Sequence, residues 1–98
     1  VVDPHTGQGL MMTRALGDRG LRHVGVVPDP ECRATTVGPD DVAVVVATDG
    51  LWDVLAEPEV AVIARAEEDA EAAAARLVGA VIERDGPDNV AVVVARLA

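Results

Sequence analysis

The sequence predicts a mixed α/β fold of the α+β type, in which two antiparallel strands pack against helices on one face. Two apolar, β-branched runs, VAVVVA at residues 42–47 and VAVVVARL at residues 90–97, have the composition of strands buried on both faces. Between them, residues 58–65 and 69–84 have the apolar spacing of helices. The order strand, helix, helix, strand allows the two strands to be antiparallel neighbours.

The first forty residues are rich in glycine and proline, and they predict short or irregular structure. Residues 1–9 favour a loop, and residues 10–17 favour a short helix that ends at Gly17. Residues 19–31 favour an extended segment with turns, and residues 33–37 favour a short strand before a Gly-Pro stop.

The helical segments carry start and stop signals. Residues 51–55 favour one helical turn, Pro58 suits the first position of the next helix, and Asp69 suits the N-cap of the one that follows. Asp85-Gly86-Pro87 ends this last helix. Trp52 is the sole aromatic residue and is expected to fill the core. One face of the last helix carries six apolar residues: Ala73, Ala74, Leu77, Val78, Val81 and Ile82.

Composition excludes several classes of partner. The 98 residues allow one small domain, and the first residue, Val1, favours a fragment over a complete chain. The net charge is −9 and all eight basic residues are Arg, with no basic stripe, so we expect neither nucleic acid nor an anionic membrane as a partner. The single Cys32 forms no internal disulfide, which favours a reducing, cytoplasmic location.

Two short acidic clusters interrupt the apolar pattern. One, TDGLWD at residues 48–53, follows the first strand, and the other, GPDN at residues 86–89, precedes the second. If the strands are antiparallel neighbours, Asp49 and Asp88 converge at one sheet edge, where their repulsion favours a divalent cation such as Mg²⁺ or Mn²⁺. Gly50 then lets the backbone approach the ion. The other interpretation is that these aspartates only form turns.

Four segments occur in an order that resembles the later motifs of the type 2C, metal-dependent serine/threonine protein phosphatases. They are LMMTRALGD at 10–18, VVPDPE at 26–31, VAVVVATDGLWDVL at 42–55 and GPDNVAVVVA at 86–95. The resemblance implies that residues 1–98 are the C-terminal portion of a single catalytic domain. It also implies a four-layer α-β-β-α sandwich with mainly antiparallel sheets.

The resemblance further implies an activity and a site. The activity is hydrolysis of phosphoserine and phosphothreonine in protein substrates by a metal-activated water, with two Mn²⁺ or Mg²⁺ ions in the intact domain. Asp49 and Asp88 correspond to metal-ligating aspartates of the family, and no residue of this chain is assigned as a catalytic acid, base or nucleophile. Arg14 and Asp18, in the TRALGD segment, could pair and fix that segment. His5 and His23 are expected to be solvated.

The chain also departs from the family pattern. The family's Asp-Gly pair on an N-terminal strand, its phosphate-holding Arg and its other mid-chain aspartate ligand have no match here, and neither Asp3 nor Asp40-Asp41 replaces them. These 98 residues alone are therefore expected to lack activity. The alternative is a non-catalytic, pseudophosphatase-like interaction domain. A metal-binding or interaction fragment without phosphatase ancestry would predict that the two acidic clusters lie far apart.

Overall fold

The computed structural model describes residues 1–97. The chain divides into two compact units, Val1–Thr36 and Val37–Ala98. The second unit contains most of the regular structure. Its elements are β1 (Ala43–Ala47), α1 (Asp49–Trp52), α2 (Glu57–Ala66), α3 (Ala70–Glu83) and β2 (Val92–Arg96).

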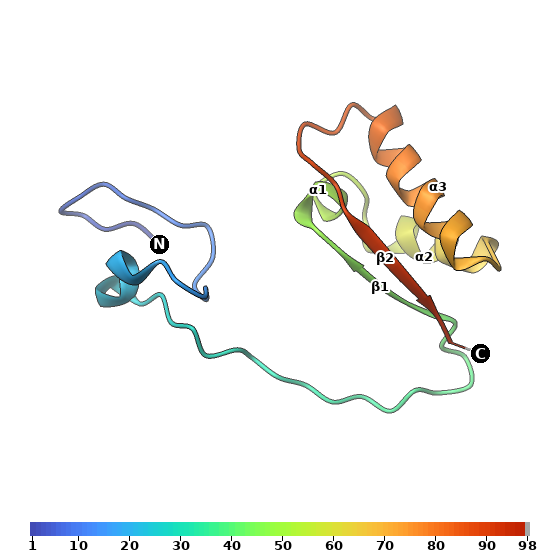
Figure 1. Ribbon diagram of the computed structural model, residues 1–98, viewed down its shortest axis with the longest axis horizontal. Helices are drawn as coiled ribbons and strands as arrows, with labels where there is room; N and C mark the ends of the chain where they lie inside the picture. Colours follow the sequence, from blue (N-terminus) through green and yellow to red (C-terminus); the bar gives the residue numbers. More distant parts are fainter. Residues whose placement is uncertain (98) are drawn as a thin grey trace. The chain divides into compact units, whose positions relative to one another are not determined.

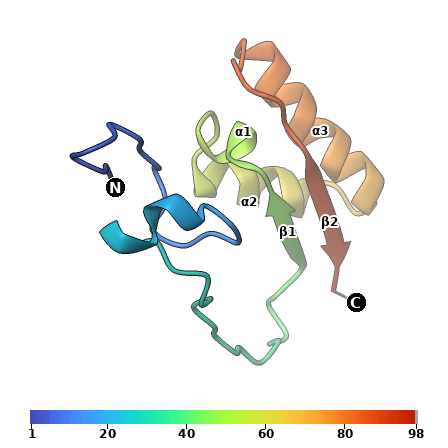
Figure 2. The same ribbon diagram turned by 60° about the vertical axis from the view of Figure 1, so that its left-hand side comes forward.

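The two strands form an antiparallel pair, as the order of the elements predicted. The register runs from Ala43 opposite Arg96 to Ala47 opposite Val92. Helices α2 and α3 lie on the same face of this pair, and α1 follows directly from the end of β1 (Figures 1 and 2). The expectation of a mixed α+β fold with helices on one face of an antiparallel sheet is therefore confirmed.

The core of the second unit lies between this sheet and its helices. Apolar side chains of the inner sheet face, among them Val45 and Val94, pack against a buried cluster supplied by the helices and the turn after α1. Burying apolar surface in this way is the main stabilising contribution that such a unit has. The buried cluster consists of Leu51, Leu55, Val60, Leu77 and Val81.

The outer face of the sheet is apolar but uncovered within the described part of the unit. Both strands alternate between half-buried and exposed residues. Val46 and its cross-strand partner Val93 are 64% and 65% exposed. The prediction that both strands are buried on both faces is thus wrong for this chain. Continuous β-branched runs indicate a sheet with two apolar faces, and they do not say which segment covers each face.

The helix signals are largely confirmed. The Asp69 carboxylate accepts the Ala72 backbone N–H at 2.9 Å and caps α3. Pro58 is the second residue of α2 instead of the first. The left-handed conformation of Asp85, with φ of 53°, follows the end of α3. On the predicted apolar face of α3 only Ile82 is exposed, whereas Ala73, Leu77 and Val81 are buried and the other two residues are half-buried.

The first unit differs from the prediction at three places. Residues 10–17 form no helix, because the backbone of Thr13 and Ala15 bonds to Val27 in a parallel bridge centred on Arg14. Residues 19–24 form a 3₁₀ helix, η1 (Arg19–Val24), instead of an extended segment. Residues 33–37 form no strand, and the sheet of the described residues consists of β1 and β2.

A buried carboxylate organises the first unit. Asp3 is 2% exposed and accepts hydrogen bonds from the His5 backbone N–H and the Thr6 hydroxyl, both at 2.9 Å. It also lies 3.1 Å from Nε2 of His23, at η1. The hydrogen bonds from His5 and Thr6, and after them His23, hold the Asp3 pKa below its ordinary value, although burial opposes this.

No helix within residues 1–97 combines the length and the apolar character needed to cross a bilayer.

Candidate metal site

The end of β1 and the start of β2 are joined beyond the last regular strand pair. After Ala47 opposite Val92, the Thr48 N–H donates to the Ala91 carbonyl at 3.1 Å. The Ala91 N–H in turn donates to Oγ1 of Thr48, also at 3.1 Å. The segment that begins at Asp49 and the segment that contains Asp88 therefore come from adjoining backbone, as antiparallel pairing predicted.

Gly50 is buried against the β2 side of this junction. A Cβ atom at position 50 would overlap the carbonyl of Asn89 and crowd the Cα of Val90. From the sequence, glycine at position 50 was expected to let the backbone approach an ion. In the structure, glycine at this position lets the backbone of α1 approach the backbone at Asn89.

The two candidate ligands are both exposed at the surface of this junction. Asp49 is the first residue of α1, and its carbonyl accepts the Asp53 N–H at 2.8 Å. One oxygen of the Asp88 carboxylate accepts the Asn89 N–H at 2.7 Å. Asp53 serves as the C-cap of α1.

The donor chemistry of the pair fits a hard divalent cation, because both donors are carboxylates on adjoining segments. Within residues 1–97, however, no three His, Cys, Asp or Glu side chains gather closely enough to hold a metal ion. The described chain therefore offers a partial donor set, and a two-ion centre requires further ligands from other residues.

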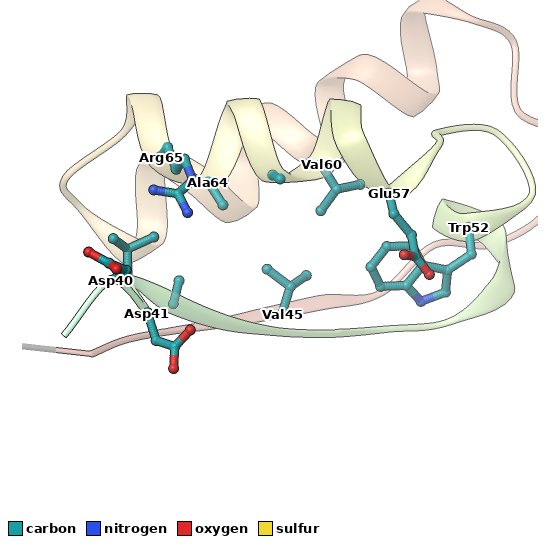
Figure 3. Close-up of a pocket in the computed structure, with 11 residues that line it drawn as sticks. Asp40, Asp41, Val45, Trp52, Glu57, Val60, Ala64 and Arg65 are labelled. Atoms are coloured by element: carbon teal, nitrogen blue, oxygen red, sulfur yellow. The ribbon is translucent and has the colours of Figure 1, made fainter. Parts of the chain in front are cut away.

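Trp52 is not a core residue, contrary to the expectation. It is 39% exposed, and its indole N–H donates to the Ala47 carbonyl at 3.3 Å. With Val45 and Val60 it lines a groove of about 370 Å³ between β1 and α2 (Figure 3). Leucine and valine side chains fill the core instead. The Trp52 indole lies at one end of the groove (Figure 3).

Arg14 does not pair with Asp18. Its guanidinium donates to the backbone carbonyl of Asp29 at 2.7 Å. This hydrogen bond adds a side-chain contact to the backbone bridge between Arg14 and Val27. His23 is exposed as predicted, yet it contacts Asp3. Twenty positions separate these two residues, and a single sequence gives no signal for such a contact.

Thr48 is the residue at this site that sequence reasoning missed. Threonine before Asp-Gly has the pattern of an ordinary turn, and its bond to Ala91 depends on strand register. The sequence signal for this role is the position of Thr48 between a predicted strand and a predicted helix. At such a position the backbone carbonyl cannot accept both a helical N–H and an N–H of the neighbouring strand.

Comparison with known proteins identifies relatives. The family model described as Protein phosphatase 2C matches residues 5–90, which include both candidate ligands. Probable protein phosphatase 2C 71 of Arabidopsis thaliana is 38% identical over 90 residues, which is 92% of this chain and 20% of that protein. Probable protein phosphatase 2C 12 of Oryza sativa subsp. japonica is 42% identical over 76 residues, which is 78% of this chain and 20% of that protein.

A third relative gives the largest coverage among these three. Probable protein phosphatase 2C 45 of Oryza sativa subsp. japonica is 37% identical over 90 residues, which is 92% of this chain and 32% of that protein. The chain therefore spans between a fifth and a third of the length of these relatives.

Proposed function

Because the chain belongs to the protein phosphatase 2C family, we propose that the protein containing it hydrolyses phosphoserine and phosphothreonine in protein substrates with divalent metal ions. In this proposal Asp49 and Asp88 are metal ligands, and the ions are Mn²⁺ or Mg²⁺. The supporting observation is the pairing of the backbone at Thr48 with that at Ala91, which joins the two aspartate-bearing segments.

Electrostatics favours a cation between two such carboxylates. Two carboxylates on adjoining segments repel each other, and a divalent ion bound between them would offset that repulsion. When bound, the ions would lower the pKa of a water molecule and neutralise charge on the phosphoryl oxygens. Two carboxylates carry half of the charge needed to balance two divalent ions, so the activity belongs to the protein that supplies the other ligands.

The location is part of the same proposal. Cys32 is a free, exposed thiol. An exposed thiol with no partner cysteine fits a reducing compartment, and we place the activity in the cytoplasm.

The experiment removes one ligand charge at a time. We expect Asp49→Asn and Asp88→Asn each to lower hydrolysis of a phosphothreonine peptide on the order of 100-fold or more, because even indirect ligand contacts contribute 10–100-fold to affinity or activity. Each change preserves the shape of the side chain and removes one negative charge from a proposed metal ligand. The assay is phosphate release at several Mn²⁺ concentrations, with a chelator as the second arm.

A matched control comes from the same loop as Asp88. Asp85 is exposed and left-handed, a conformation that asparagine tolerates, so Asp85→Asn should leave turnover unchanged. Chelator-resistant hydrolysis by the unmodified protein would refute metal dependence. A folded protein without hydrolysis at any Mn²⁺ concentration would favour the pseudophosphatase-like interaction domain.

A further inference from the structure

Thr48 is the point at which the chain changes from strand to helix. Its own backbone is extended, with φ of −75° and ψ of 167°, yet its carbonyl already accepts the Leu51 N–H at 3.0 Å and so begins α1. The Thr48 carbonyl is therefore turned toward the helix and is not available to β2.

This change of direction leaves a gap in the strand ladder. Because the Thr48 N–H donates to the Ala91 carbonyl, these residues form a hydrogen-bonded pair of an antiparallel ladder. In a regular ladder the Ala91 N–H would return to the Thr48 carbonyl. Here it donates to Oγ1 of Thr48 at 3.1 Å, so the side chain replaces the missing backbone acceptor.

The hydroxyl serves the neighbouring strand and not its own helix. A threonine at an N-cap commonly accepts an N–H of the first helical turn, and Thr48 makes no such bond. Thr48 and Ala91 are thus joined by two hydrogen bonds. Thr48 directly precedes Asp49, and Ala91 lies three residues after Asp88. Together with the Gly50–Asn89 approach, the two hydrogen bonds fix one segment against the other.

We infer that Thr48 is a positioning residue for the metal site, an inference that rests on the proposed function. Its hydroxyl holds the segments that carry Asp49 and Asp88 at the spacing needed to bind one ion cluster. Both Thr48 and Ala91 are exposed, so water competes for the Ala91 N–H as soon as the hydroxyl is removed. The junction then opens at the end that carries the ligands.

The test compares Thr48→Val with Thr48→Ser in the full-length protein. Valine keeps the branched shape and removes the acceptor, whereas serine keeps the acceptor. We expect Thr48→Val to raise the Kd for Mn²⁺ about tenfold, the lower end of the range for residues that act behind a ligand. Thr48→Ser should bind nearly as the unmodified protein does. The measurements are Mn²⁺ titration calorimetry and amide hydrogen exchange, without substrate.

Hydrogen exchange reports whether the effect is local. In Thr48→Val the Ala91 amide should exchange faster, while the Val93 amide inside β2 keeps its protection. Thr36→Val is the control, because Thr36 is exposed and its hydroxyl makes no hydrogen bond among residues 1–97. If Val93 also loses protection, Thr48→Ala, which lacks the methyl group that valine adds, repeats the comparison with Thr48→Ser.

The outcomes separate the inference from the function on which it rests. Faster Ala91 exchange with unchanged Mn²⁺ affinity would overturn the positioning role and leave the proposed function standing. Equal loss of affinity in Thr48→Val and Thr48→Ser would show that the hydroxyl acceptor is not what matters. An unmodified protein that binds no Mn²⁺ would overturn both.

Discussion

The two units of the chain are stabilised by different means. Residues 37–97 bury seven apolar side chains between a sheet and three helices, whereas residues 1–36 bury two, Leu21 and Val26. In the first unit the most connected buried group is a carboxylate, Asp3, with three hydrogen-bond partners. One unit therefore depends on apolar burial, and the other depends heavily on one charged side chain.

This difference predicts different sensitivities to mutation and to pH. Apolar burial depends on the volume and packing of side chains and does not titrate. A buried carboxylate contributes only while it is ionised and its donors are in place. Changes that remove volume should affect the second unit, and changes that remove charge should affect the first.

The largest effect should come from α3. Leu77→Ala removes a side chain that is 0% exposed in the core, and we expect the free energy of unfolding to fall by about 2–5 kcal/mol. Ile82→Ala is the matched control, because it removes as many atoms from the same helix at a position that is 66% exposed. Its cost should stay within about 0.5 kcal/mol. Urea unfolding followed by Trp52 fluorescence measures both, and equal midpoints would refute the assigned core.

Periodicity explains why the second unit could be predicted. The VAVVVA run, the Leu77 and Val81 spacing and the Asp69 cap are local signals, and each led to the correct element. Antiparallel pairing of these two strands then predicts that Asp49 and Asp88 lie on adjoining segments.

Three of the errors share one physical cause, which is that the deciding partner is distant in sequence. The residues around Arg14 follow a bridge to Val27, and Trp52 stays outside a core already filled by leucine and valine. Thr48 acts through Ala91, forty-three positions away. Local propensity carries no information about such partners.

The next effect concerns pH in the first unit. The folded pKa of Asp3 lies below its unfolded value, mainly because the His5 N–H and the Thr6 hydroxyl bond the ionised carboxylate. Its stabilising contribution is therefore fully present above the unfolded pKa of about 3.9, and it is lost as pH falls through the lower folded pKa. We expect the amides of residues 1–10 to lose exchange protection below about pH 4.

Two comparisons test whether ionised Asp3 causes this loss of protection at low pH. Asp3→Asn should lose the same protection at neutral pH, several-fold in exchange rate, and its remaining protection should vary little down to pH 3. In the second unit the Glu59 pKa is also lowered, by its hydrogen bond to Arg84, but that pair is half-exposed and contributes little. If the amides of α3 lost protection at the same pH as residues 1–10, Asp3 would not be the cause.

The smallest change in stability should come from the outer sheet face of the second unit. Val46 and Val93 form a cross-strand pair there, and Val45 and Val94 form the adjacent pair on the inner face. Threonine has nearly the shape of valine and suits a strand, so the outer double substitution should cost no more than about 1 kcal/mol. The same double substitution on the inner face buries two hydroxyls without partners and should cost several times more.

Self-association of the chain should respond more to the outer double substitution than to the inner one. An exposed apolar sheet face promotes contact between molecules, so we expect the 98-residue chain to self-associate through Val46, Val93 and their neighbours. The outer threonine pair should therefore shift sedimentation toward monomer while the unfolding midpoint barely moves. The inner pair should lower the midpoint without favouring the monomer, because its side chains face α2 and α3. If the outer pair leaves sedimentation unchanged, the association surface lies elsewhere, and exposure of the outer face has no consequence for the isolated chain.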